Sequence, residues 1–95
     1  DFESHFYPQA DFKATYRFQI TDKKKNYLVE VNNTDLKCYY GAKDNVDVDV
    51  KLTSEMIQTI LRGKMTFQRA FMSGEMTAKG DFHLLRMLDQ LFLFG

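Results

Sequence analysis

The spacing of the apolar residues changes at residue 53, and this change limits the possible folds more than any other feature of the sequence. In residues 46–52, which read VDVDVKL, apolar and polar side chains alternate, as they do in a strand with one buried face. After residue 53 the apolar side chains recur every three or four residues, as they do on one face of a helix. The chain is therefore expected to contain strands that are followed mainly by helices.

Three more strands are predicted upstream of this change. The alternation in residues 12–21 places on one face the apolar side chains of Phe12, Ala14, Tyr16, Phe18 and Ile20. The segments YLVEV, residues 27–31, and LKCYYG, residues 36–41, have the same period, and short polar turns separate the three segments. Consecutive strands joined by short turns predict an antiparallel meander. The residues before Pro8 are expected to form a short helical turn or an irregular lead-in.

Two short helices and a fifth strand are predicted after the change in period. Thr53 or Ser54 can cap the first helix, and Gly63 is expected to end it. The second helix is expected at about residues 66–72, and the strand at residues 75–79.

The final segment, residues 81–95, is predicted to form a helix with more apolar surface than one packing contact requires. Asp81 can cap this helix, and its polar side chains occupy the smaller part of the circumference. A helix that lies on one sheet needs only an apolar stripe. The surplus suggests a second contact with a ligand, a partner subunit or another part of a longer chain. The alternative is that the segment packs entirely into a small core.

The composition excludes several classes of function. With 95 residues the chain is expected to form a single domain, residues 1–95, although a start at Asp1 is also consistent with a piece of a longer protein. Because 13 basic residues balance 13 acidic ones, no nucleic-acid partner is expected. No apolar run is long enough for stable membrane insertion, and without targeting signals the expected location is cytoplasmic.

Few residues could serve in catalysis or metal binding. His5 and His83 lie far apart in different sequence contexts, and no spacing of His, Cys, Asp and Glu resembles a metal site or an activated nucleophile. The single cysteine, Cys38, cannot form an internal disulfide. Neither an enzyme nor a metal or cofactor site is therefore expected.

One stretch of the sequence carries a resemblance to a known family. Residues 63–81 read GKMTFQRAFMSGEMTAKGD, in which a Gly-Lys pair ends one helix, a short helix ends in Ala-Phe-Met, and a Gly-x-x-x-x-x-Gly-Asp segment leads into the last helix. This order resembles the sterol carrier protein 2 family of non-specific lipid-transfer domains. The matching positions are Gly63, Lys64, Gln68, Ala70, Phe71, Met72, Gly74, Gly80 and Asp81. Glu75 departs from the basic residue that is usual in the family.

The resemblance implies an α/β (α+β) sandwich, in which a five-stranded, mainly antiparallel sheet is covered on one face by helices, with an apolar tunnel between them. Members of the family carry sterols, fatty acids, fatty acyl-CoA or phospholipids and need no cofactor. The residues expected to line the tunnel are apolar and fall on inward phases of the predicted elements: Met56, Ile60, Phe67, Phe71, Met76, Phe82, Leu85, Leu88 and Phe92. Gln68 is the candidate for orienting a ligand head group, or alternatively a cap or surface residue.

A difference from the family keeps a second function open. Free-standing carriers begin with a substantial amphipathic helix, whereas this chain has only DFESHF before Pro8. Sterol-carrier-like domains also occur at the C-terminal ends of larger enzymes, including certain acetyltransferases and alkyl sulfatases. The alternative is therefore a packing or oligomerisation module with no ligand of its own, which would form a homodimer or contact a parent chain through the C-terminal helix.

Overall fold

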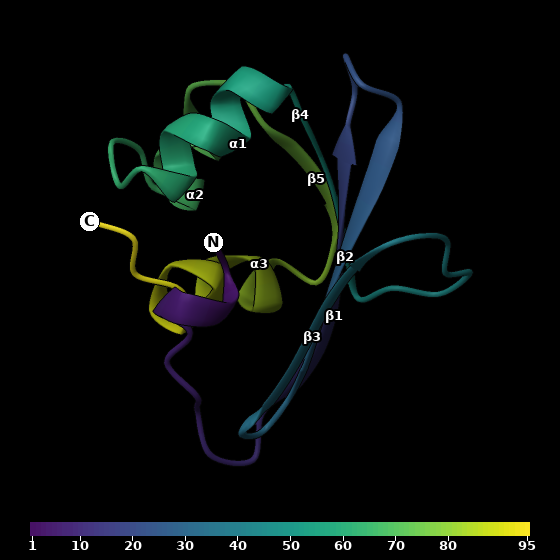
Figure 1. Ribbon diagram of the computed structural model, residues 1–95, viewed down its shortest axis with the longest axis vertical. Helices are drawn as coiled ribbons and strands as arrows, with labels where there is room; N and C mark the ends of the chain where they lie inside the picture. Colours follow the sequence, from purple (N-terminus) through teal and green to yellow (C-terminus); the bar gives the residue numbers. More distant parts are fainter.

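The computed structural model describes residues 1–95 and places a mixed sheet beside a layer of helices (Figure 1). In chain order the elements are η1 (Glu3–His5), β1 (Lys13–Ile20), β2 (Lys25–Asn32), β3 (Asp35–Tyr40), β4 (Val48–Leu52), α1 (Ser54–Leu61), α2 (Phe67–Met72), β5 (Thr77–Gly80) and α3 (Phe82–Leu91). The helices and both chain ends lie on the same side of the sheet (Figure 1). The predicted fold class, with its order of strands and helices, is confirmed.

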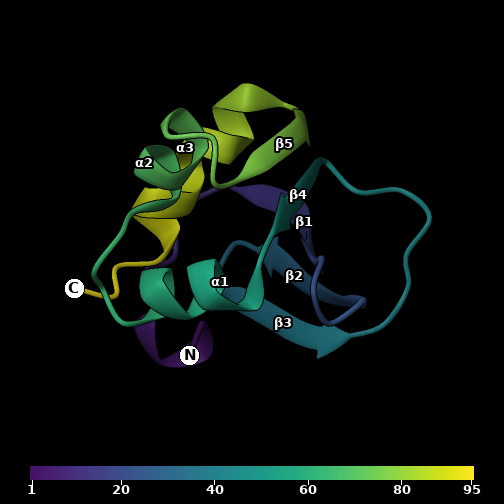
Figure 2. The same cartoon turned by 90° about the horizontal axis from the view of Figure 1, so that it is seen from above.

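The five strands follow one another in the order β3-β2-β1-β4-β5 (Figure 2). β1, β2 and β3 form the predicted antiparallel meander, β4 lies parallel to β1, and β5 is antiparallel to β4. In the parallel pair Tyr16 lies opposite Val48, and Phe18 lies opposite Val50. Because residues that face each other across a ladder share one side of the sheet, the apolar faces of β1 and β4 combine into one surface.

The core lies between this surface and the helices. On β1 the buried residues are Ala14, Tyr16, Phe18 and Ile20, as the alternation predicts. Helix side chains that include Ile57, Ile60, Phe67 and Leu88 form one cluster with the first three of these residues, whereas Ile20 lies outside it. Leu28 is a buried residue outside this cluster, since it lies opposite Arg17 on the other face of the sheet. Every residue that is almost fully buried is hydrophobic.

β4 and β5 each begin two residues later than predicted. β4 begins at Val48 rather than Val46, and just before it the carboxylate of Asp47 accepts the backbone N–H of Thr15 at 2.8 Å. β5 begins at Thr77 because the N–H groups of residues 75 and 76 donate to the carbonyl of Ala70 and extend the turn after α2.

The predicted helix caps are confirmed. Thr53 accepts the N–H of Met56 at the start of α1, and Asp81 accepts two N–H groups in the first turn of α3 at 2.9 and 3.2 Å. Gly63 follows α1 with φ of +76°, a conformation that glycine adopts without steric cost. A side chain at Gly63 would also collide with Gly95, whose Cα would lie 2.5 Å from the added Cβ.

The prediction that the last helix continues to the end of the chain is wrong. α3 ends at Leu91, and Phe92 is extended and forms a bridge with Phe6. The N–H of Tyr7 donates to the carbonyl of Leu91 at 2.7 Å, and the N–H of Leu93 donates to the carbonyl of His5. The helix stops because its last residues pair with the lead-in segment, which contains the expected short helical turn.

No helix in the structure has both the length and the apolar character needed to cross a bilayer.

Candidate functional site

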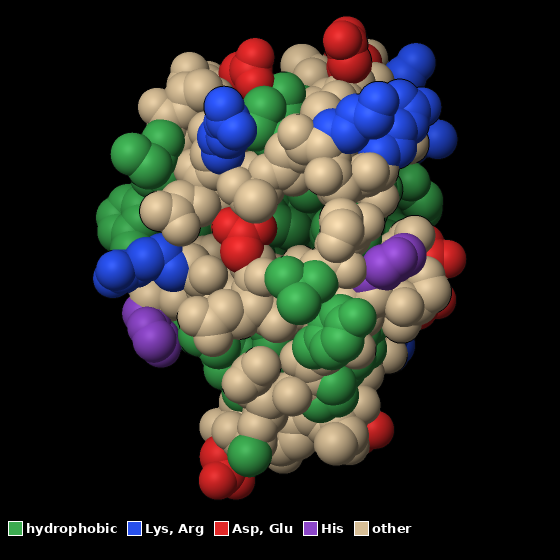
Figure 3. All heavy atoms as spheres, turned by 90° about the vertical axis from the view of Figure 1, so that its left-hand side faces the viewer, with side chains coloured by type: hydrophobic (Ala, Val, Ile, Leu, Met, Phe, Trp, Pro, Cys, Tyr) green, Lys and Arg blue, Asp and Glu red, His purple; other side chains and the backbone are tan.

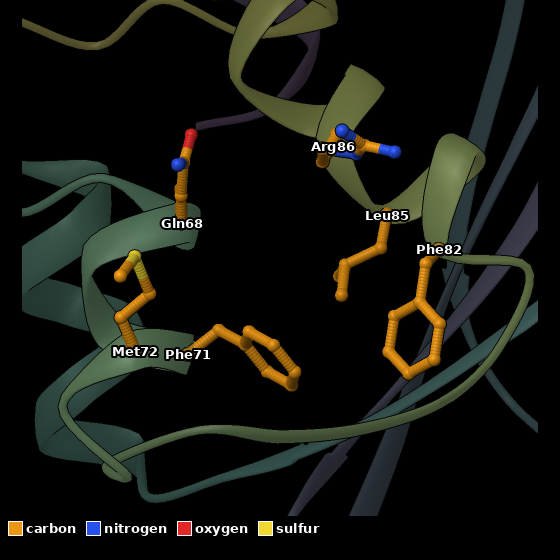
Figure 4. A pocket seen from close by; sticks show the side chains of 6 residues that line it. All are labelled: Gln68, Phe71, Met72, Phe82, Leu85 and Arg86. Carbon is orange, nitrogen blue, oxygen red and sulfur yellow. The ribbon is translucent and has the colours of Figure 1, made fainter.

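A hollow of about 240 Å³ lies between α2 and α3, and we call it the α2–α3 groove. Figure 4 shows its lining residues, which are Gln68, Phe71 and Met72 from α2 and Phe82, Leu85 and Arg86 from α3. All of them belong to the helices, and no strand residue lines the groove.

The groove forms because two helices present equally spaced residues to each other. The lining residues of α2 are separated by three and four positions, and those of α3 have the same separations. Residues with these spacings lie on one face of a helix. The sequence therefore specifies an α2 face and an α3 face, and the tertiary structure brings them together.

Asp89 fixes the relative position of the two helices. Its carboxylate, on α3, accepts the backbone N–H groups of Phe67 and Gln68 at the start of α2, each at 2.9 Å. These N–H groups have no partner within their own helix because they belong to its first turn. These two hydrogen bonds thus satisfy N–H groups at the N-terminus of α2 and connect α2 to α3.

Most of the lining is apolar and accessible. The rings of Phe71 and Phe82 lie 6.0 Å apart, centroid to centroid, and Leu85 is buried beneath them in the core. Met72 is 76% exposed and Phe82 is 56% exposed. Figure 3 shows that hydrophobic side chains reach the surface of the helix layer in several places, among basic and acidic groups. In the groove they gather around a concave surface.

Two polar side chains complete the lining. Gln68 and Arg86 lie on one side of the groove, across from the rings of Phe71 and Phe82 (Figure 4). The two ion pairs in the structure join Arg17 to Asp49 and Lys43 to Glu30, so neither involves Arg86.

The groove brings together some of the residues predicted to bind lipid, namely Gln68, Phe71, Phe82 and Leu85. The others lie elsewhere: Ile60, Phe67, Met76, Leu88 and Phe92 are buried in the main core, and Met56 is half-buried on α1. The expected tunnel between the sheet and the helices stays a prediction.

Sequence reasoning did not assign Met72 and Arg86 to the site. Met72 follows Gln68 by four positions, and Arg86 follows Phe82 by four, so helical spacing from predicted residues could have identified both.

A second hollow, of about 440 Å³, lies where the N-terminal segment and α1 meet one end of the sheet. Its lining is more mixed and includes Lys23, Lys25 and Tyr40. None of the residues predicted to bind lipid lines it. We therefore take the α2–α3 groove as the candidate site.

No three His, Cys, Asp or Glu side chains lie close enough together to hold a metal ion. The thiol of Cys38 faces the core from β3. Burial raises its pKa to about 11, which leaves it mostly protonated near neutral pH.

Solved structures with the same fold include lipid-bound sterol carriers. The structure of sterol carrier protein 2 from Aedes aegypti in complex with palmitate has a TM-score of 0.66 and 21% identity, and the match covers 94% of this chain and 81% of that one. The palmitated sterol carrier protein 2-like 2 of the same organism has a TM-score of 0.72 and 21% identity, with 86% and 74% covered.

The fold also occurs within a larger enzyme. The stereoselective inverting sec-alkylsulfatase from Pseudomonas sp. has a TM-score of 0.73 and 24% identity. The match covers 85% of this chain but only 13% of the alkylsulfatase, so the chain corresponds to a small part of that enzyme.

The sequence itself gives the family. No curated protein sequence matches the chain. The profile of the SCP-2 sterol transfer family, however, matches residues 9–93, which include every strand and helix from β1 to α3. The chain belongs to the SCP-2 sterol transfer family.

Proposed function

We propose that this chain binds or transfers a hydrophobic small molecule without catalysis, and that the α2–α3 groove holds part of the ligand. The observation that carries the proposal is the set of accessible apolar side chains that two helices direct into one hollow. Membership of the SCP-2 sterol transfer family and the palmitate complexes of structural relatives support the same class of ligand.

The size of the groove indicates how the ligand sits. Pockets that enclose a drug-sized ligand usually have about 300–1,000 Å³, and the groove has about 240 Å³. Covering an apolar side chain of the size of Met72 or Phe82 contributes up to about 2 kcal/mol. The groove is therefore large enough for only part of a long acyl chain or ring system. The rest of the ligand would contact the neighbouring surface or a space that opens as the ligand enters.

Native mass spectrometry of the purified protein tests the proposal directly. We expect a bound apolar molecule, which organic extraction would release for identification. If the protein is empty and stays empty after incubation with fatty acids, acyl-CoA, sterols and phospholipids, the proposal fails.

A pair of substitutions then tests the location of the ligand. Phe82→Ala removes an exposed wall of the groove, whereas Leu93→Ala removes a residue that is similarly exposed, at 52%, but lies outside the groove. We expect Phe82→Ala to weaken ligand binding about tenfold and Leu93→Ala to leave it unchanged. Equal affinities for the two variants would place the ligand elsewhere in the fold.

A second candidate function is a packing module of a larger assembly. It is favoured by the exposure of Met72 and Phe82 together with the presence of this fold within the alkylsulfatase. In that case the protein would be ligand-free and self-associated, and Phe82→Glu would give a monomer in sedimentation experiments. A ligand-free protein that is already monomeric would argue against a homodimer. Phe92 is unsuitable for this test because it is buried in the core, so a charge there would unfold the protein.

A further inference from the structure

The groove has an arginine at its rim whose charge has no partner within the protein. Arg86 lines the groove and is exposed, and it takes part in neither of the two ion pairs. Arg17 provides a contrast, since its guanidinium donates to the carboxylate of Asp49 and to the carbonyl of Lys43. Arg17 is thus held by an ion pair and hydrogen bonds within the protein, whereas Arg86 has no ion pair.

The nearest acidic residue along α3 is committed to another contact. Asp89 lies one turn after Arg86, but both of its carboxylate oxygens accept backbone N–H groups of α2. The first-turn N–H of Arg69 is accepted in turn by Thr66. The polar groups that remain to face a ligand in the groove are the side chains of Arg86 and Gln68.

We propose that Arg86, assisted by Gln68, binds the carboxylate of the ligand, so that the α2–α3 groove selects long-chain carboxylic acids over neutral lipids. This inference rests on the proposed function and specifies its class of ligand. A guanidinium offers a planar pair of N–H donors that matches the two oxygens of a carboxylate. The Gln68 amide adds two further N–H donors.

The polar and apolar side chains of the groove are arranged so that a ligand with one polar end would bind in a single orientation. The polar side chains lie on one side of the groove, and the rings of Phe71 and Phe82 lie on the other (Figure 4). A carboxylate beside Arg86 would leave its hydrocarbon chain over the aromatic rings and Met72. Because the groove supplies one cation and one neutral donor, it balances a single negative charge. A phosphate monoester, which carries up to two charges at neutral pH, would be only partly neutralised.

Palmitate and 1-hexadecanol, which have equal chain lengths and different head groups, test this assignment. The affinity of delipidated protein for each is measured for the unsubstituted protein, Arg86→Gln, Arg86→Lys and Arg69→Gln. Arg69 is the matched control, because it is an exposed arginine on α2 that does not line the groove. We expect Arg86→Gln to weaken palmitate binding about tenfold and to leave hexadecanol binding unchanged.

The other variants and a salt titration separate charge from geometry. Arg86→Lys retains the charge without the planar fork, so it should give an intermediate affinity for palmitate, and Arg69→Gln should match the unsubstituted protein. Added NaCl should weaken palmitate binding in the unsubstituted protein more than in Arg86→Gln.

The outcomes distinguish this inference from the proposed function beneath it. If Arg86→Gln binds palmitate as tightly as the unsubstituted protein while both lipids bind, the role of Arg86 is overturned and the groove remains. The same conclusion follows if Arg69→Gln weakens palmitate binding equally, because the effect then comes from overall charge. If the unsubstituted protein binds neither lipid, the proposed function and this inference both fail.

Discussion

Tyr16 shows how a single polar atom is accommodated in an otherwise apolar core. The residue is fully buried on β1, and its hydroxyl donates to the carbonyl of Leu84 on α3 at 2.6 Å. Burial, with a smaller contribution from the charges of Asp47 and Asp81, raises the pKa of the hydroxyl. The group therefore stays protonated and acts as a donor that links the sheet to the last helix.

Tyr16→Phe is expected to lower the free energy of unfolding by about 1 kcal/mol, because the carbonyl of Leu84 loses its side-chain donor. Urea titration would measure the change. Tyr40→Phe is the control, since Tyr40 is mostly exposed and its hydroxyl has no hydrogen bond within the protein. Equal stabilities for the two variants would contradict the importance of the bond.

The thiol of Cys38 leads to a prediction about reactivity and pH. Burial, the largest cause, raises its pKa from 9.0 to about 11. At pH 8 the thiolate fraction should therefore be about a hundredfold smaller than in the unfolded chain. Alkylation with iodoacetamide should accordingly be slow in the folded protein and fast in urea. A rate in the folded protein that equals the rate in urea would show that the thiol is not protected.

The same shift has a defined effect on stability. Because the folded state binds the Cys38 proton more tightly than the unfolded state, its contribution to stability is fully present below pH 9. The contribution is lost as the pH rises through about 11. Cys38→Ser would remove this part of the pH dependence.

At the scale of elements, α2 depends on another helix for its start. It has six residues, which is too short for a helix to be stable alone. Thr66 caps it locally, and Asp89 of α3 accepts two more of its first N–H groups. Since α2 carries Gln68, Phe71 and Met72, the shape of the groove depends on this contact.

Asp89→Ala is expected to lower the free energy of unfolding by about 1–2 kcal/mol, the usual cost of losing a capping side chain. Thermal or urea unfolding would measure it, with the exposed neighbour Gln90→Ala as the control. We also expect Asp89→Ala to weaken ligand binding more than Gln90→Ala does, since α2 would no longer be held against α3. If Asp89→Ala lowers the stability but leaves the ligand affinity unchanged, the cap stabilises the fold without affecting ligand binding in the groove.

At the scale of the whole molecule, the first residues of the chain complete the core. Phe2 is buried, although it lies outside the part of the sequence that matches the family. Its ring lies within 6.3 Å, centroid to centroid, of the rings of Phe18, Tyr27, Phe67, Phe92 and Phe94. The two ends of the chain therefore meet on the helix-covered side of the sheet.

Phe2→Ala is expected to lower the free energy of unfolding by about 3 kcal/mol or more, because it leaves a cavity among aromatic rings. Phe82→Ala, at a mostly exposed position, should cost less than about 1 kcal/mol and serves as the control in the same urea titrations. Similar costs for both variants would mean that the N-terminal segment does not contribute to the stability of the core.

The features that could be predicted from the sequence are mostly local. Alternation predicted the inward face of β1, and Thr53 and Asp81 cap α1 and α3 as their side-chain chemistry predicts. The motif in residues 63–81 predicted the family, and the profile match over residues 9–93 confirms it. These inferences succeed because side-chain periodicity and helix caps depend on residues only a few positions apart.

Which element packs against each apolar face could be learned only from the folded structure. The pattern of residues 81–95 fits a helix throughout, yet α3 ends at Leu91 because Phe92 pairs with Phe6. Likewise, Phe67 and Leu88 enter the core whereas Phe71 and Phe82 line the groove. A sequence pattern records which face of an element is apolar and not which distant element packs against it, because that choice depends on the packing of the whole chain.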